Sequence, residues 1–235
     1  SYHVGAATPP EEMTTALQDA LYDCDWIPYE VFEGDMRIQG NTLELRDERY
    51  RVLIVPAVEA LPVATLEKAL EYLQAGGIVV GYGRLPSRSA TFGAGSGGAQ
   101  ALAEAIWGSP SGPSLRPCRE LPSGGRSYFL PERPSVADIQ TVLAGDAGVR
   151  PTLEVLKGDT GDWLHVLHRQ KDDRDIFFLT NMNNDQEIRC FSLRATAAGY
   201  PEVWDAMRGE ITSVPFRRVG DSVTLPLTLA GGESV

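Results

Sequence analysis

The hydrophobic pattern of this 235-residue chain changes character near residue 151. Before that point, apolar runs suited to buried strands alternate with stretches in which apolar residues recur every three or four positions, as in amphipathic helices. After it, short β-prone runs follow one another between polar turns, and no stretch has helical spacing. The change predicts two domains of different class, an α/β domain at residues 1–150 and an all-β domain at residues 151–235.

The first half contains a strand, a helix and a second strand in close succession. Residues 50–55 are nearly continuous in apolar character and end at Pro56, as expected of a strand that is covered on both faces. Residues 62–77 carry an apolar stripe at helical spacing between a proline and a glycine pair. Residues 78–80 give the next strand, so the two strands are predicted to be parallel neighbours.

The same alternation continues on both sides of this unit. The further predicted elements are a strand at 2–7, a helix at 10–22, a helix at 99–107, a strand at 127–130 and a helix at 136–143. The recurrence predicts a layered α/β domain of flavodoxin-like type, in which helices cover a parallel sheet.

In the second half, the β-prone runs are separated by aspartate, asparagine and glycine residues typical of hairpin turns. Strands are predicted at 163–168, 176–180, 187–193, 202–204, 211–216 and 222–227, with hairpin loops at 172–173 and 181–185. Several short strands at this spacing predict an antiparallel β-sandwich.

The charge of the chain limits the classes of partner. The 32 acidic residues outnumber the 21 Lys and Arg, and the net charge of −11 opposes contact with nucleic acid or an anionic membrane surface. No apolar run has the roughly 18 to 20 residues that cross a bilayer. The three cysteines are far apart in sequence, so neither a metal site nor a disulfide framework is predicted. No cofactor is predicted either. Because the chain starts at Ser1, we expect a processed protein or a piece of a longer one, and no compartment is assigned.

Candidate site residues in the first half follow two of the predicted parallel strands. Ligands bind outside the carboxyl ends of such strands, so Glu59 and Arg84 are candidates to bind a hydroxyl and an anion. The alternative is that Glu59 caps its turn or faces water there, and that Arg84 pairs with a surface carboxylate. A hydrolase would need a nucleophile at 81–83, where only Tyr82 stands, a poor nucleophile with no base evident in the sequence.

In the second half, the candidate binding residues are mainly aromatic. Trp163 and His165 share one face of a predicted strand, and with Tyr200 and Trp204 they could form a platform for stacking a sugar ring. The alternative is that these rings fill the core of the sandwich. His168 lies on the opposite face of the same strand, so the two histidines are not predicted to share a metal.

Several segments together resemble a known family. They are Tyr-Arg-Val-Leu-Ile-Val-Pro-Ala-Val-Glu-Ala-Leu-Pro at 50–62, Ala-Gly-Gly-Ile-Val-Val-Gly-Tyr-Gly-Arg-Leu-Pro at 75–86, and the shorter segments 20–27, 175–181, 201–205 and 209–211. This set resembles the region downstream of the catalytic barrel in glycoside hydrolase family 106, the α-L-rhamnosidases. The segment from 50 to 86 is also similar to the trimerisation domain of family 42 β-galactosidases.

The resemblance implies a glutamine-amidotransferase-like α/β domain without an amidotransferase site, followed by a β-sandwich. In that family the catalytic carboxylates and calcium ligands belong to the barrel, so no catalytic residue is carried over to this sequence. The expected function is therefore a non-catalytic accessory region, a scaffold or interface, whose partner is an upstream barrel of the same polypeptide. Carbohydrate and a second copy of the chain are further candidate partners. A stand-alone carbohydrate-binding protein and a small α/β hydrolase are the alternatives, so whether the protein is an enzyme stays open.

Overall fold

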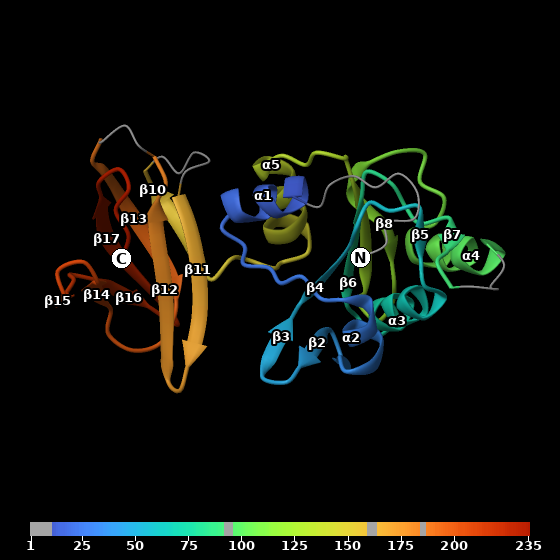
Figure 1. Ribbon diagram of the computed structural model, residues 1–235, viewed down its shortest axis with the longest axis horizontal. Coiled ribbons are helices and arrows are strands. Elements are labelled where there is room, and N and C mark those ends of the chain that lie inside the picture. The colour runs from blue at the N-terminus through green and yellow to red at the C-terminus, as the bar shows by residue number, and fades with distance from the viewer. Residues whose placement is uncertain (1–10, 92–95, 159–163, 184–186) are drawn as a thin grey trace. The chain divides into compact units, whose positions relative to one another are not determined.

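The computed structural model describes residues 11–91, 96–158, 164–183 and 187–235. The predicted strand at 2–7 and the candidate residue Trp163 lie outside these ranges. The described residues form two compact units, one within 11–16 and 25–149 and the other within 17–24 and 150–235. Figure 1 shows the helices and strands of each unit along the chain. Among the described residues, no helix has the length and apolar character needed to cross a membrane.

The first unit is a mixed α/β unit, as the sequence predicts. Its helices are α2 (Tyr29–Gly34), α3 (Val63–Gln74), α4 (Ser96–Trp107) and α5 (Val136–Ile139), and α5 continues into a π-helix, η1 (Gln140–Asp146). Its strands are β1 (Arg37–Gln39), β2 (Thr42–Leu45), β3 (Glu48–Tyr50), β4 (Val52–Val55), β5 (Ala60–Leu61), β6 (Ile78–Tyr82), β7 (Arg88–Ser89), β8 (Ser114–Glu120) and β9 (Arg126–Leu130). Helix α1 (Glu11–Asp19) lies across the division between the two units.

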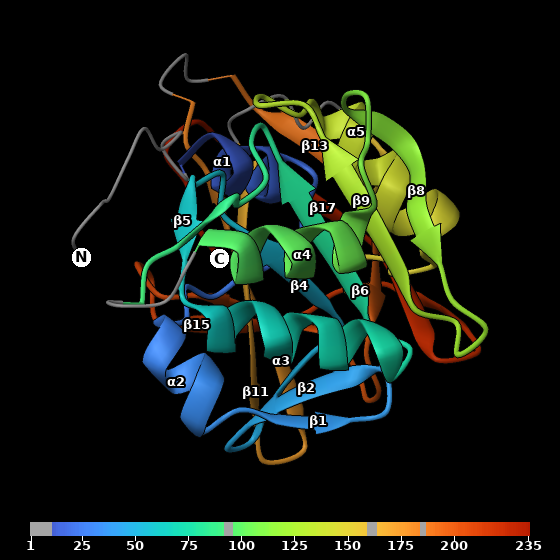
Figure 2. The same cartoon turned by 90° about the vertical axis from the view of Figure 1, so that its right-hand side faces the viewer.

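A four-stranded sheet in the order β4-β6-β9-β8 organises the first unit. Strands β4, β6 and β9 are parallel, which confirms the predicted strand, helix and strand of residues 50–80, and β8 is antiparallel to β9. Helices α3 and α4 lie on one face of this sheet (Figure 2). Every residue of β6 is buried, as expected for the central strand of a sheet that is covered on both faces.

Several parts of this unit were not predicted, among them α2 and the short strands β5 and β7. Strands β1, β2 and β3 form a separate antiparallel sheet before β4, so the apolar run at 50–55 is divided between two sheets. Strand β8 is largely exposed and contains Pro117. Its sequence therefore lacks the alternation of apolar and polar residues that marks a half-buried strand. The predicted helix at 136–143 is a short α-helix that continues as a π-helix, a change of hydrogen-bond period that apolar spacing does not reveal.

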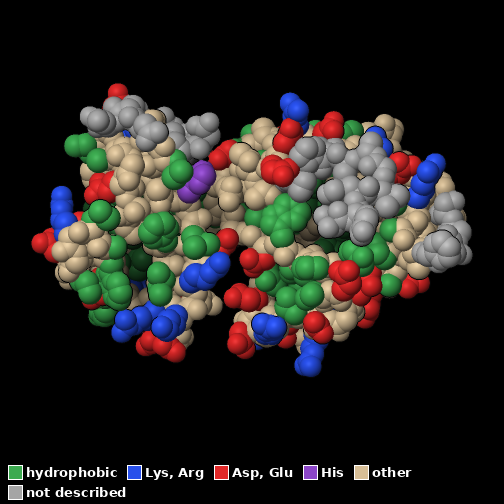
Figure 3. All heavy atoms as spheres, viewed as in Figure 1, with side chains coloured by type: hydrophobic (Ala, Val, Ile, Leu, Met, Phe, Trp, Pro, Cys, Tyr) green, Lys and Arg blue, Asp and Glu red, His purple; other side chains and the backbone are tan. Residues whose placement is uncertain are grey.

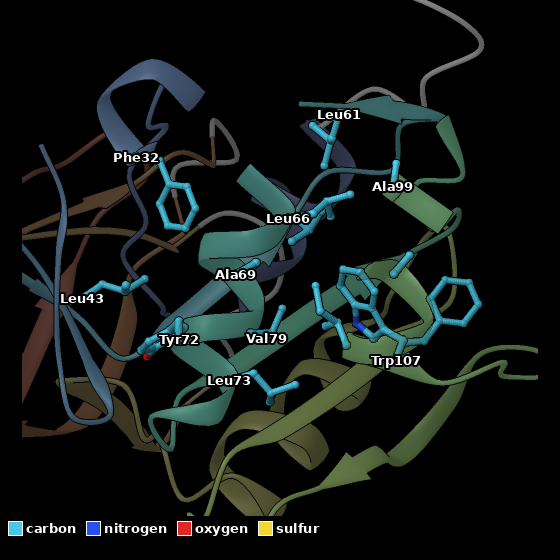
Figure 4. Packing of buried hydrophobic residues seen from close by; sticks show 14 of the residues in the cluster. Phe32, Leu43, Leu61, Leu66, Ala69, Tyr72, Leu73, Val79, Ala99 and Trp107 are labelled. Carbon is cyan, nitrogen blue, oxygen red and sulfur yellow. The ribbon is translucent and has the colours of Figure 1, made fainter. Parts of the chain in front are cut away.

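The core beneath α3 and α4 is built from apolar side chains of helices, sheet and flanking strands (Figure 4). Leu66, Ala69, Tyr72 and Leu73 of α3 are fully buried, and Val79 of β6 and Trp107 of α4 pack into the same cluster. The helical spacing recognised in the sequence therefore marks the face of α3 that is removed from water, the main favourable term in its docking.

Tyr72 combines this burial with a polar anchor. Its hydroxyl donates to the carbonyl oxygens of Arg51 and Asn41, at 2.8 and 3.0 Å. Burial raises the pKa of Tyr72 to about 12. Between pH 10 and 12 the unfolded chain therefore releases a proton that the folded chain keeps, so the free energy of unfolding falls as pH rises through this window.

We expect Tyr72→Phe to reduce the alkaline sensitivity of the fold, while the other buried tyrosines, Tyr22, Tyr82 and Tyr128, keep their share of it. At neutral pH the variant should lose about 1 kcal/mol with the hydrogen bonds, whereas the wild type should lose about 2 to 3 kcal/mol from Tyr72 between pH 9 and 12. Thermal midpoints across that range measure the difference, with the exposed Tyr200→Phe as control. An equal fall in the wild type and in Tyr72→Phe would contradict the assignment.

In residues 150–158, 164–183 and 187–235, the second unit contains strands and no helix. Its strands are β10 (Leu153–Lys157), β11 (Leu164–Lys171), β12 (Arg174–Asn181), β13 (Arg189–Thr196), β14 (Glu202–Asp205), β15 (Glu210–Ser213), β16 (Arg217–Val219) and β17 (Ser222–Leu229). An antiparallel sheet has the order β10-β13-β17-β16, and β11 with β12 and β14 with β15 form two hairpins. The strand predicted at 211–216 is present as β15 but ends earlier, at Ser213.

The core of the second unit unites its larger sheet with the β11–β12 hairpin. Leu164 of β11, Leu179 of β12, Leu193 of β13 and Leu229 of β17 belong to one buried cluster. The hairpin turns at Asp172 and Asp173, as predicted, with Asp172 in the left-handed backbone region that aspartate tolerates.

Residues 17–24 belong to the second unit, although the sequence places them within the first predicted domain. Leu21 packs against the apolar cluster of the second unit, and Asp23 forms an ion pair with Arg169 of β11. A contact between residues so far apart in sequence leaves no local signal, so periodicity could not reveal it.

Candidate functional site

The carboxyl edge of the parallel sheet brings two of the predicted residues together. Val55 of β4 pairs with Gly81 of β6, so the segments that follow these strands leave the sheet at the same edge. Glu59 follows β4 and Arg84 follows β6. Their closest side-chain atoms, Glu59 Oε2 and Arg84 Nη1, are 3.9 Å apart. The carboxylate that Arg84 approaches is therefore the other predicted site residue.

Glu59 has a closer partner that the sequence analysis missed. Arg88 Nε lies 3.0 Å from Glu59 Oε1, and the backbone amide of Arg88 donates to the carbonyl oxygen of Glu59, also at 3.0 Å. The amide of Ser87 donates to the same oxygen. The parallel pairing of β5 with β7, which includes Arg88, places this side chain beside Glu59. Two largely exposed guanidinium groups thus face a single carboxylate, and such surface ion pairs contribute at most about 1 kcal/mol each.

Tyr82 ends β6 beside this cluster in sequence, yet its side chain is buried. Only 1% of the residue is exposed. Burial raises the pKa of Tyr82, and a hydrogen bond with the backbone of Ala57 lowers it to a lesser extent. The carboxylates of Glu11 and Glu12 raise it further. The phenol therefore stays protonated at neutral pH, and its chemistry is that of a hydrogen-bonding core residue.

In the second unit, His165 lies on β11 directly opposite Thr180 of β12 and is partly exposed. Since His165 and His168 are three residues apart on one strand, their side chains are on opposite faces of the hairpin, as predicted. No group of three or more metal-ligating side chains is present in the described part of the chain.

His168 forms a polar cluster that the sequence analysis did not single out. Its Nε2 lies 2.9 Å from Asp175 Oδ1, and its ring stacks on Phe177 with centroids 4.4 Å apart. Gln170 donates to the same Asp175 oxygen at 3.0 Å, while His168 Nδ1 is 3.5 Å from the Thr152 hydroxyl. The contacts of His168 and Gln170 with Asp175 thus link strand β11 to strand β12.

Solved structures share the fold of this chain. A rhamnosidase from Novosphingobium sp. PP1Y matches 89% of the chain with a TM-score of 0.64 and 19% sequence identity. The chain spans only 19% of the length of that rhamnosidase. A family 42 β-galactosidase from G. stearothermophilus matches 95% of the chain with a TM-score of 0.57 and 15% identity, over 34% of its own length.

No curated protein matches the chain in sequence. A family model does match. The model of glycoside hydrolase family 106, described as alpha-L-rhamnosidase, matches residues 1–218, which is nearly the whole chain. This match agrees with the resemblance seen in the segments around residues 50–86. The chain therefore belongs to glycoside hydrolase family 106.

Proposed function

We propose that the chain is a non-catalytic accessory region of an α-L-rhamnosidase-like glycoside hydrolase, and that it serves as scaffold or interface for a catalytic barrel in the same polypeptide. One observation carries this proposal. The family match extends over residues 1–218, yet the chain corresponds to only 19% of the matched rhamnosidase. A region that corresponds to about one fifth of the matched enzyme is consistent with an accessory part of a much larger protein.

The chemistry of the first unit supports the same role. Its parallel strands and covering helices fit a glutamine-amidotransferase-like layered domain, and the antiparallel sheets of the second unit fit a β-sandwich. In such a layered domain a nucleophile would follow β6, where this chain has the buried, protonated Tyr82. Glu59 at the same edge is held by Arg84 and Arg88. These side chains stabilise the edge of the sheet.

Hydrolysis of an aryl α-L-rhamnoside tests the proposal. We expect the 235-residue chain alone to release no nitrophenol from 4-nitrophenyl α-L-rhamnopyranoside, and the complete product of its gene to release it. A Glu59→Gln variant of the complete protein should keep the wild-type kcat, because this carboxylate is assigned to the loop. Turnover by the chain alone, or a loss of kcat by two orders of magnitude in Glu59→Gln, would overturn the proposal.

A further inference from the structure

The hairpin of β14 and β15 presents large apolar side chains to solvent. Trp204 and Ile211 face each other across the two strands and are 52% and 59% exposed. Val203 packs against the core of the second unit, so its neighbour Trp204 points away from that core. Met207 in the turn and Tyr200 before β14 are exposed still further, at 92% and 86%. Figure 3 shows hydrophobic side chains at the surface of this unit among charged ones.

The Trp204 ring is held in place by a contact within its own strand. Its Nε1–H donates to Glu202 Oε2 at 3.2 Å. The polar edge of the indole is therefore satisfied, while its face remains available. The turn is also fixed, because Asp205 Oδ1 accepts from the backbone amides of Met207 and Arg208, each at 3.0 Å. A preorganised aromatic face loses little conformational entropy when a ligand stacks on it.

We propose that Trp204 and Ile211 form a binding surface for a 6-deoxyhexose unit of a rhamnose-containing glycan, an assignment that rests on the proposed role of the chain within a rhamnosidase. The face of an aromatic ring is electronegative and attracts the slightly positive C–H groups of a pyranose. A 6-deoxy sugar carries a methyl group where other hexoses carry a hydroxymethyl. Ile211, directly across from Trp204, offers an aliphatic contact for that methyl group.

The charges around the pair favour a neutral polyol as ligand. Residues 202–213 carry three carboxylates, those of Glu202, Asp205 and Glu210, and a single guanidinium, that of Arg208. A carboxylate has about four acceptor sites, so Glu202 can accept from a sugar hydroxyl as well as from Trp204. A second copy of this chain, with a net charge of −11, would meet like charge at the hairpin. A neutral glycan would not be repelled by these carboxylates.

Titration of the 235-residue chain with two matched glycosides tests the site. Methyl α-L-rhamnopyranoside and methyl α-L-mannopyranoside differ only in the hydroxyl at C6, and saturation-transfer NMR reports binding in the millimolar range. We expect saturable binding of the rhamnoside and at least threefold weaker binding of the mannoside. Trp204→Ala should weaken rhamnoside binding at least tenfold, and Ile211→Ala should reduce the preference between the two glycosides.

Trp26→Ala is the matched control, since Trp26 is 60% exposed in the first unit. It should bind the rhamnoside as the wild type does. Lack of saturation at 50 mM rhamnoside, or equal binding by the wild type and by Trp204→Ala, would overturn the assignment. Both results leave the accessory role intact, because that role is tested by turnover of the aryl rhamnoside. Turnover by the chain alone would overturn the accessory role, but the binding measurements would still decide whether Trp204 and Ile211 bind the rhamnoside.

Discussion

Replacing Gly125 by alanine is expected to unfold the first unit. A methyl group at this position would lie 1.9 Å from the carbonyl oxygen of Leu73 and 2.9 Å from its carbonyl carbon. Both atoms belong to the backbone of α3, so no side-chain rotation relieves the clash. The turn before β9 would have to move away from the helix, at a cost of about 4 kcal/mol or more. Urea denaturation followed by circular dichroism measures the loss.

Gly98→Ala is the control for this variant. Gly98 lies within α4, and an added Cβ meets no other atom within 4 Å. Since alanine favours a helix over glycine by about 1 kcal/mol, this variant should be as stable as the wild type or more so. If Gly125→Ala had the wild-type urea midpoint, the close approach of the turn to α3 would be refuted.

Truncation of Trp107 to alanine is the second large effect. The indole is 1% exposed, and its Nε1–H donates to the carbonyl oxygen of Tyr128 at 3.0 Å. The ring lies over Gly81 of β6, where an added Cβ would come within 3.2 Å of it. Removing the ring leaves a cavity between α4 and the sheet and should cost about 3 to 5 kcal/mol. The fall of the thermal midpoint of the chain measures this loss.

Two further variants separate burial from other effects of losing a tryptophan. Trp107→Phe should recover part of the lost stability, because it keeps an aromatic ring but not the hydrogen bond. Trp26→Ala removes an exposed indole and should change stability by less than about 0.5 kcal/mol. A similar loss in Trp26→Ala and Trp107→Ala would show that α4 is not anchored as described.

The sequence by itself determined the elements that have a strong local period. Apolar residues at helical spacing between Pro62 and Gly76 predicted α3, and the apolar runs on either side predicted the parallel strands β4 and β6. The change of pattern near residue 151 predicted a mixed α/β part followed by an all-β part. The edge strand β8 was missed, because its residues do not follow the strand period, and the helix predicted at 136–143 is a π-helix from Gln140 onward.

The tertiary structure alone decided which residues meet. The sequence named Glu59 and Arg84 at one edge of the sheet, but it did not indicate that Arg88 is the closer partner of Glu59. Nor did it indicate that His168 pairs with Asp175, or that residues 17–24 join the second unit. A periodic pattern reflects the burial of one segment, whereas an ion pair or a docked segment depends on two segments being brought together by the whole fold. Local residue patterns therefore indicate which face of a segment is buried, but they do not indicate which distant segment it contacts.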